Sequence, residues 1–194
     1  MGERCWESSD PLYNAYHDEE WGLPVLEERG LYERFCLEGF QSGLSWLTIL
    51  RKREGFRAAF AGFDPERVAR FGKRDVQRLL TDASIVRHRG KIEATIANAQ
   101  ATLDLREAGS PLPLVVWSHR PAKSRPPCSH SDWHSQTPES VALSKALCKA
   151  GFRFVGPTTA YAAMQACGVV NDHLATCPAR KAAEHALAAA RIPV

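Results

Sequence analysis

The amino-acid sequence predicts an all-helical protein, and two kinds of local signal lead to that expectation. At three places a capping residue is followed by proline, in Asp10-Pro11, Asp64-Pro65 and Thr137-Pro138, which is typical of the first turn of a helix. Between residues 91 and 105 apolar side chains recur at the spacing of one helix face. No segment alternates convincingly between apolar and polar residues as a half-buried strand would, so we expect helices nearly throughout.

The expected helices can be followed along the chain from these signals. The first begins after Asp10-Pro11, and others begin after Asp64-Pro65 and after Thr137-Pro138. Apolar spacing or alanine-rich sequence predicts further helices at residues 31–37, 44–50, 73–80, 91–105, 158–166 and 180–190.

One stretch, residues 111–138, is rich in Pro, Ser, Arg and His and predicts a long irregular surface loop. It contains Cys128, His130 and His134, so a metal site within the loop is conceivable. Two or three ligands on a flexible loop are a weak signal, however, and we expect no metal there.

Length and composition set broad limits. A chain of 194 residues with 44% hydrophobic and 24% charged residues is expected to fold as a single domain spanning residues 1–194 with a sizeable core. A net charge of +3 is compatible with nucleic-acid binding without requiring it. The sequence has no membrane-length apolar run and no signal core, so we expect a cytoplasmic protein. Its six cysteines are then expected to be thiols or metal ligands.

The stretch from Cys36 to Trp46 is the part of the chain that helical periodicity does not explain. Gly39 and Gly43 predict a loop or a broken helix start between two helices. Glu38 lies at the front of this segment and Trp46 at its back. A carboxylate, a flat ring and a closely approachable backbone are the components of a pocket for a flat polar molecule. On these residues alone, the alternative is that Glu38 is a solvated helix residue and Trp46 a core residue.

A short connection rich in basic residues joins the helices expected at 73–80 and 91–105. It contains Ile85 and Val86, followed by Arg87, Arg89 and Lys91. Two helices joined by a tight turn, with amides and basic side chains at the start of the second helix, can bind phosphate. The alternative is a solvated basic turn without a ligand.

Candidate metal ligands occur at both ends of the chain. Three residues separate His173 from Cys177, and on a helical turn this spacing would place both side chains on one face. Such a pair supplies half of a tetrahedral zinc site. Cys5 and His17 can supply the other half, although their separation is not that of a standard zinc finger. The alternative for the aromatic segment around His17 is a flap that only covers the core.

Taken together, several motifs resemble one protein family, the 3-methyladenine DNA glycosylase I family of the helix-hairpin-helix superfamily. The resemblance extends from about Arg4 to Cys177 and is specific because the motifs occur in one order. They are Asp10-Pro-Leu-Tyr-Asn-Ala-Tyr-His-Asp-Glu-Glu-Trp-Gly22, Leu37-Glu-Gly-Phe-Gln-Ser-Gly-Leu-Ser-Trp46, Arg87-His-Arg-Gly-Lys-Ile92, Phe152-Arg-Phe-Val-Gly-Pro-Thr-Thr159 and Asn171-Asp-His173.

The resemblance implies a function and a role for individual residues. It implies a monomeric enzyme that flips N3-methyladenine out of alkylated double-stranded DNA and hydrolyses its N-glycosidic bond without nicking the strand. Glu38 is then the catalytic residue that recognises the methylated base. By the same resemblance, the ligands of one structural Zn²⁺ are Cys5, His17, His173 and Cys177. Trp46 is the ring that stacks on the base. The other rings around the base are those of Tyr13, Tyr16, Trp6 and Trp21. The residues that contact DNA are Gly43 and Leu44, which fill the gap left by the flipped nucleotide, and Ile85, Arg87, Arg89 and Lys91.

Three departures from the family pattern bear on these expectations. Cys5 directly precedes Trp6, where the family usually has one residue between them, and this puts the role of Trp6 in doubt. Ser84 stands where the hairpin usually has glycine, so the turn is expected to be less permissive. The segment containing Cys128, His130, Trp133 and His134 matches nothing in the family pattern.

Two other classes of function are also open. One is a zinc-stabilised module that binds damaged DNA without excision, which would not need Glu38. The other is a catalytic zinc hydrolase, but such a site has an open metal position, whereas four ligands that include two thiolates fit a closed structural site better. No residue is identified as the base that activates the attacking water, and Lys91 is expected at a phosphate rather than in a covalent lyase step.

Overall fold

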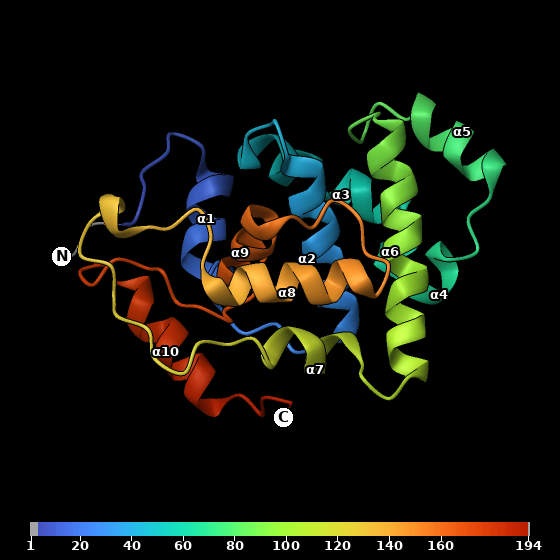
Figure 1. Cartoon of the computed structure of the whole chain (residues 1–194). Helices are drawn as coiled ribbons and strands as arrows, with labels where there is room; N and C mark the ends of the chain where they lie inside the picture. Colours follow the sequence, from blue (N-terminus) through green and yellow to red (C-terminus); the bar gives the residue numbers. More distant parts are fainter. Residues whose placement is uncertain (1–3, 194) are drawn as a thin grey trace.

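The computed structural model describes residues 4–193 and is helical, with no strand in that range. Two short 3-10 turns, η1 (Ala61–Phe63) and η2 (His130–Asp132), accompany the helices. The helices, labelled in Figure 1, are α1 (Pro11–Glu19), α2 (Glu28–Gln41), α3 (Trp46–Ala59), α4 (Pro65–Val68), α5 (Lys73–Thr81), α6 (Arg89–Glu107), α7 (Leu112–Trp117), α8 (Pro138–Lys149), α9 (Pro157–Ala166) and α10 (Ala179–Ala189). The prediction of an all-helical fold is therefore confirmed for the described part of the chain.

The predicted helix starts form because each capping side chain accepts a hydrogen bond from a backbone amide in the first turn of its helix. Asp10 accepts a hydrogen bond from the amide of Leu12 at 2.9 Å, and Asp64 accepts from the amide of Glu66 at 2.9 Å. Thr137 accepts from the amide of Ser140 at 3.2 Å. In each case the next residue is the proline that begins the helix, where its missing amide proton costs nothing.

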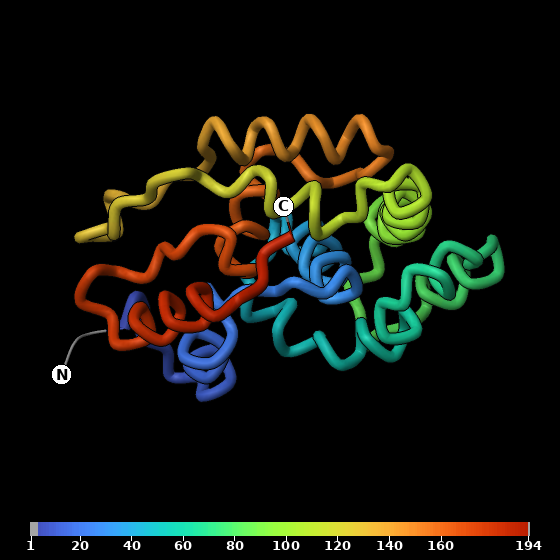
Figure 2. The backbone as a smooth tube through the Cα atoms, turned by 90° about the horizontal axis from the view of Figure 1, so that it is seen from below, coloured from blue at the N-terminus to red at the C-terminus, as the bar shows by residue number. Residues whose placement is uncertain are grey.

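Helix α2 is the centre of the fold. It contacts α3, α6, α7 and α9, and Figure 2 shows it enclosed by the other helices. Leu31, Phe35, Leu37 and Phe40 are almost fully buried along it. Burial of this kind stabilises a helix far more than its intrinsic propensity does, so α2 is held as one rigid element.

Two segments from opposite ends of the sequence lie side by side. The N-terminal segment and α1 lie beside the segment leading into α10 (Figures 1 and 2). Here a second hydrophobic cluster, separate from the main core, contains Cys5, Tyr16, Trp21, Leu174 and Cys177. Trp46 packs against both clusters, which places the start of α3 at their junction.

The structure corrects two expectations about irregular segments. Helix α2 does not end before Glu38 but runs through Gly39 to Gln41, because its buried face continues through Phe40. The interruption before α3 is shorter than expected and has Gly43 at φ +82°. The segment 111–138 is not wholly irregular either, since α7 forms within it and buries Leu112, Val116 and Trp117. No helix within residues 4–193 has both the length and the apolar character needed to cross a bilayer.

Candidate functional site

Four side chains from the two ends of the chain form a buried cluster of metal-ligand type. One ligand atom from each of Cys5, His17, His173 and Cys177 lies within 4.8 Å of every other. The Cys5 sulfur is 3.4 Å from His173 Nδ1, and the Cys177 sulfur is 3.6 Å from both His17 Nε2 and His173 Nδ1. These separations fit a tetrahedral ion whose bonds to nitrogen and sulfur are about 2.0–2.3 Å long.

The histidine nitrogens that face away from the cluster have partners of their own. His17 Nδ1 is 2.8 Å from an Asp18 carboxylate oxygen, and His173 Nε2 is 2.9 Å from the Trp21 carbonyl oxygen. Each partner can accept a hydrogen bond from a protonated outer ring nitrogen, which makes the inner nitrogen an acceptor able to bind a metal. Arg4 pairs with Asp18 and is the main reason that the pKa of this carboxyl falls to about 2.

The chemistry of the donors agrees with their geometry. Burial lowers the pKa of His173 to about 4, so its ring is neutral at physiological pH, as a ligand requires. Without a cation, burial raises the pKa of the Cys5 thiol to about 12, so a metal ion would be needed to hold it as thiolate. The amide of Leu174 already donates to the Cys5 sulfur at 3.2 Å. The four residues therefore fit a closed metal site.

The backbone between His173 and Cys177 is not the helical turn that their spacing suggested. These residues are irregular in the structure, and α10 begins only at Ala179. The two side chains converge because Arg180 donates to the carbonyls of Asn171 and His173, which folds the segment back on itself.

A pocket lined mainly by aromatic rings lies beside the metal-ligand cluster, and we call it the aromatic pocket. Its volume of about 230 Å³ is below the range for drug-sized ligands and suits one small flat molecule. The two sites share a wall, since the Trp6 ring contacts His17 edge-on at 4.6 Å and Trp21 contacts His173 at 4.7 Å. The lining residues are Trp6, Tyr13, Tyr16, Trp21, Glu38, Gln41, Trp46, Trp133, Ala162 and Gln165.

The departure at Cys5-Trp6 does not displace Trp6 from this pocket. Its ring lies 5.4 Å from that of Tyr13 and 4.9 Å from that of Trp21. On the other side of the pocket, Tyr16 and Trp46 pack with their ring centroids 5.3 Å apart. All five aromatic residues predicted for base binding therefore line one cavity, even though the whole of α2 separates Trp46 from the other four along the chain.

Glu38 is the one carboxylate among the residues that line the aromatic pocket. Only 5% of the residue is exposed, and no hydrogen bond joins its carboxylate to another described residue. Burial raises its pKa to about 8, against an opposing effect of the nearby Arg34 cation. The free protein therefore holds Glu38 largely protonated at neutral pH, whereas the sequence had suggested an ionised group. The indole N–H groups of Trp6 and Trp46 are also buried without a partner.

Trp133 belongs to the aromatic pocket and was not predicted from the sequence. It lies in the segment that matches no family motif, yet its ring is 6.4 Å from that of Trp6 and 6.1 Å from that of Trp21. Its indole N–H donates to the Asp172 carbonyl at 2.9 Å, and His130 Nε2 contacts the carbonyl of Cys5. The only early signal was a tryptophan in an otherwise polar loop, and sequence spacing cannot show where such a loop docks.

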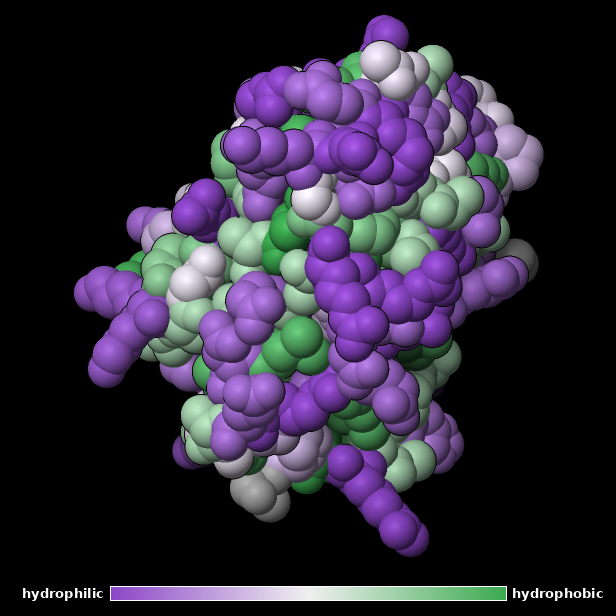
Figure 3. Space-filling model, turned by 90° about the vertical axis from the view of Figure 1, so that its right-hand side faces the viewer, coloured by the Kyte–Doolittle hydropathy of each residue, from purple (hydrophilic) through white to green (hydrophobic). Residues whose placement is uncertain are grey.

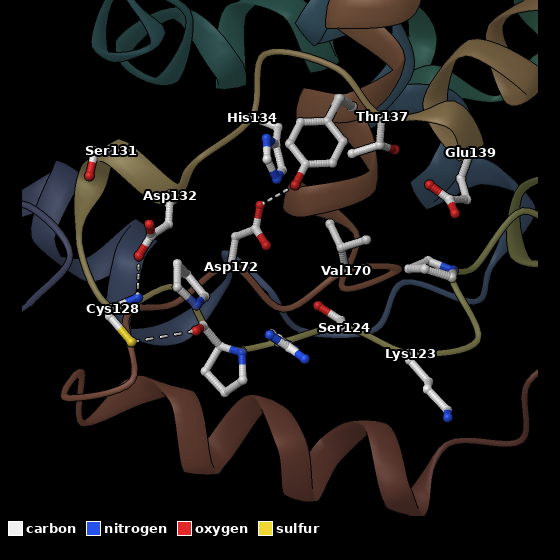
Figure 4. A pocket seen from close by; sticks show the side chains of 15 residues that line it. Lys123, Ser124, Cys128, Ser131, Asp132, His134, Thr137, Glu139, Val170 and Asp172 are labelled. Atoms are coloured by element: carbon white, nitrogen blue, oxygen red, sulfur yellow. Dashed lines mark hydrogen bonds between the residues drawn. The ribbon is translucent and has the colours of Figure 1, made fainter.

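A second cavity, of about 580 Å³, lies on the other side of Asp172 under residues 121–139 and is drawn in Figure 4. Tyr161, which lines this cavity, donates to the Asp172 carboxylate. Gln165, which lines the aromatic pocket, donates to the same carboxylate. The lining mixes cations with anions, among them Lys123, Asp132 and Glu139. Within the described chain the one group of three or more potential ligands that lie close together is the Cys5 cluster, and neither Cys128 nor His134 belongs to it.

The basic connection between α5 and α6 forms a tight turn at the edge of the molecule. Arg87 and Arg89 are exposed, whereas the side chain of Ile85 is buried, so Ile85 can meet a ligand only through its backbone. Ser84 fits the turn without a positive φ, and its amide and hydroxyl both donate to Asp82. The missing glycine is thus tolerated, because a serine–aspartate hydrogen-bond pair shapes the turn.

Lys91 is not at the surface, where a phosphate contact would need it. Its residue is 8% exposed, and Nζ donates to the carbonyls of Phe40 at 2.8 Å and Ser42 at 2.6 Å. The Lys91 ammonium therefore caps the C-terminal end of α2, where the helix dipole favours a cation. Lys91 thereby fixes the connection between α2 and α3, which contains Gly43 and Leu44. Leu44 is 40% exposed.

Comparison with known proteins agrees with this architecture. A family model described as methyladenine glycosylase matches residues 6–181. DNA-3-methyladenine glycosylase 1 of Escherichia coli K12 is 52% identical over 179 residues, or 90% of this chain and 95% of that protein. A crystal structure of a 3-methyladenine DNA glycosylase I matches with a TM-score of 0.88 and 50% identity, over 91% of this chain and 98% of the other. The enzyme from Staphylococcus aureus, studied for its recognition of 3-methyladenine, matches with a TM-score of 0.85 and 37% identity, over 89% and 93% of the two chains. This chain belongs to the methyladenine glycosylase family.

Proposed function

We propose that this protein is a monofunctional DNA-3-methyladenine glycosylase that acts on alkylated duplex DNA as a monomeric, single-domain enzyme. The observation that carries the proposal is Glu38, a buried carboxyl group without a hydrogen-bond partner that faces a pocket of aromatic rings. A buried polar group of this kind is costly unless a ligand satisfies it. Membership of the methyladenine glycosylase family supports an alkylated base as that ligand.

The chemistry of the lesion suits such a pocket. An enzyme reaches a stacked base by extruding its nucleotide from the duplex, and this is cheapest for a damaged base that pairs poorly. In DNA, an N3-methylated adenine carries delocalised positive charge, so Trp46 can add a cation–π attraction of roughly 0.5–2 kcal/mol. The cation also lowers the pKa of Glu38 on binding, so that the bound complex holds an ionised carboxylate. Neutral adenine offers no such compensation and leaves Glu38 protonated.

Hydrolysis then needs little acid catalysis. When the bond between the sugar C1′ and the base nitrogen breaks, its electron pair neutralises the base, which leaves as uncharged 3-methyladenine. Water supplies the oxygen that bonds to C1′ and loses one proton to the solvent, and an abasic site remains. Glu38 is the one pocket carboxylate, and it stabilises the cationic base until the bond breaks. Lys91 is tied to the end of α2 and is not available for a covalent lyase step.

The hairpin between α5 and α6 is proposed to hold the DNA backbone, as in helix-hairpin-helix proteins. The first amides of a helix have no acceptor within it, and His88 already accepts from the amide of Lys91. The amides of Arg89 and Gly90 at the start of α6 are therefore the donors available to a phosphate, and the exposed Arg87 and Arg89 add positive charge. Gly43 and Leu44 are proposed to fill the space that the extruded nucleotide leaves.

The metal-ligand cluster is proposed to hold one structural Zn²⁺. Two thiolates and two imidazoles are a usual closed zinc donor set, and the carboxylate and carbonyl behind the two histidines orient them for it. The ion would join the two ends of the chain and keep Trp6 and Trp21 in the wall of the aromatic pocket.

The direct test is chromatography of the bases released from methylated duplex DNA. The protein should release 3-methyladenine, and borohydride should trap no covalent protein–DNA adduct. A trapped adduct would refute the monofunctional mechanism. Tight binding of damaged DNA with no base released, even at high protein concentration, would support a binding module instead and refute the proposed activity.

A further inference from the structure

Phe154 combines two features that a folded protein normally avoids. Its side chain is 43% exposed, one of three large hydrophobic side chains that are exposed in residues 4–193. Its backbone is at φ +57°, a left-handed conformation that is unfavourable for a bulky residue. The other non-glycine residues with positive φ in the described chain are Ala61, which is small, and Phe63, which is fully buried. Only Phe154 presents a large apolar ring to solvent from such a backbone.

Side chains on both sides of Phe154 hold this conformation in place. Asn98, which is 2% exposed, accepts a hydrogen bond from the amide of Arg153 at 2.7 Å and donates to its carbonyl at 3.2 Å. The buried Ser144 hydroxyl donates to the carbonyl of Val155 at 2.7 Å. The residues before and after Phe154 are thus fixed to α6 and α8, and the surrounding structure enforces the exposed position of the ring.

The position of the ring is next to both parts of the proposed DNA-binding surface. A Cβ atom at Gly39 would lie 3.3 Å from the Phe154 carbonyl oxygen, so the Phe154 backbone rests on α2 one residue after Glu38. A Cβ atom at Gly90 would lie 3.7 Å from Phe154 Cζ, and the His88 ring is edge-on at 6.2 Å. Phe154 therefore bridges the helix that carries Glu38 and the turn proposed to bind phosphate.

Leu44 is the other exposed apolar side chain near this junction. Lys91 connects Leu44 to Phe154. Its ammonium donates to the Ser42 carbonyl, two residues before Leu44, and its side chain borders the same small cavity as Phe154. In Figure 1 the α8–α9 connection, which carries Phe154, passes beside α2 and α6. Figure 3 views the neighbouring side of the molecule, where apolar side chains interrupt a mostly hydrophilic surface.

We propose that Phe154 is a second apolar contact to duplex DNA, which stacks on a base beside the extruded nucleotide while Leu44 fills the vacated space. The proposal rests on the proposed function and adds a residue that holds the opened duplex. Base–aromatic stacking tolerates any sequence because every base has a π-face. That property suits an enzyme that must act wherever a lesion occurs, and the rigid backbone around Phe154 would position the ring before DNA arrives.

The substitution Phe154→Gly separates this role from a structural one. Glycine adopts positive φ without strain, so the variant should melt at the same temperature as the wild type or higher. Its affinity for a duplex that contains a stable abasic analogue should fall about tenfold. Binding of free 3-methyladenine should not change, because the aromatic pocket is intact. Phe154→Tyr keeps the ring and should retain duplex affinity, and Ala61→Gly controls for relief of backbone strain alone.

A fluorescent 2-aminopurine placed directly next to the abasic analogue in the duplex reports stacking on the neighbouring base. Wild type and Phe154→Tyr should change its emission on binding, whereas Phe154→Gly should not. Unchanged duplex affinity in Phe154→Gly overturns the inference, and so does an equal loss of free-base binding, which would place the residue in the pocket. If the wild-type protein binds the abasic duplex but releases no 3-methyladenine, the proposed function fails, while the duplex affinities of the variants still decide the role of Phe154.

Discussion

The metal-ligand cluster and the aromatic pocket share a wall but treat their polar groups in opposite ways. In the cluster, the outer nitrogens of His17 and His173 both have acceptors within 2.9 Å. In the pocket, Glu38 has no partner in the described chain and the indole N–H groups of Trp6 and Trp46 have none either. A metal site whose ligands are all hydrogen-bonded on their outer side is suited to stay closed. A pocket with buried polar groups that lack partners is suited to receive a ligand.

This difference predicts opposite effects of mutation. Removal of a cluster residue should lower stability and spare the chemistry of molecules that still fold. Removal of the buried pocket carboxyl should raise stability and weaken recognition, because functional sites commonly keep groups that are unfavourable for folding.

The largest expected effect is on stability, from His173→Ala. Loss of one ligand should release the metal and lower the free energy of unfolding by roughly 3–5 kcal/mol. Metal analysis of the purified protein should give one zinc per chain for the wild type and much less for the variant. The matched control is His134→Ala, an exposed histidine outside the cluster, which should change neither quantity. Two zinc ions per chain, or an unchanged melting temperature, would contradict the closed-site interpretation.

The next effect is on excision, from Glu38→Gln, which keeps the shape of the side chain and removes its charge. A charge-assisted hydrogen bond contributes about 1.5–3 kcal/mol, so single-turnover release of 3-methyladenine should slow by roughly 10- to 150-fold. Binding of intact duplex should hardly change, because its contacts lie elsewhere. Normal excision by Glu38→Gln would end the recognition hypothesis.

The same variant should reveal the raised pKa of Glu38 in the pH dependence of stability. The folded pKa of about 8 exceeds the reference value of 4.5, so the wild type should lose stability relative to Glu38→Gln as pH rises from about 4.5 to about 8, with a constant difference above that. We expect the variant to be more stable by on the order of 2 kcal/mol at pH 9. Parallel melting curves at pH 4 and pH 9 measure this, and a variant less stable than wild type at pH 9 would assign Glu38 a structural role.

A smaller effect is expected at Trp133, which belongs to the pocket wall and also ties its loop to Asp172. Trp133→Ala should weaken binding of free 3-methyladenine about fivefold to tenfold, since it removes an aromatic surface from a small pocket. Trp133→Phe keeps a six-membered ring but loses part of the aromatic surface and the hydrogen bond to Asp172, so its affinity should lie between those of Trp133→Ala and the wild type. Calorimetric titration with the free base measures both, and equal affinities for all three proteins would exclude Trp133 from the site.

The smallest effect should come from the hairpin. Arg89→Gln should weaken binding to every duplex alike and reduce the slope of log K against log salt by about 0.9, because one phosphate is no longer neutralised. Arg191→Gln, an exposed arginine beyond the C-terminal end of α10, is the control and should leave the slope unchanged. The same slope for Arg89→Gln and the wild type would show that Arg89 does not bind a phosphate.

Local signals in the sequence were sufficient for most of the helices and for most of the residues of both sites. Capping residues followed by proline start α1, α4 and α8 as expected, because a cap acts over only a few residues. The residues predicted as metal ligands lie together in one cluster. The five predicted aromatic residues and Glu38 line one pocket. Residue type and order along the chain carry this information without reference to packing.

What the sequence alone could not determine are the properties that depend on distant segments. Gly39 looked like a helix breaker, but it lies inside α2, where the absence of a side chain leaves room for the Phe154 carbonyl. Lys91 looked like a phosphate ligand, but its ammonium caps α2. The raised pKa of Glu38 and the place of Trp133 in the pocket likewise arise only when helices and loops far apart in sequence meet. Short-range preferences determine which elements form, whereas burial, and with it the charge state and accessibility of each group, is a property of the assembled tertiary structure.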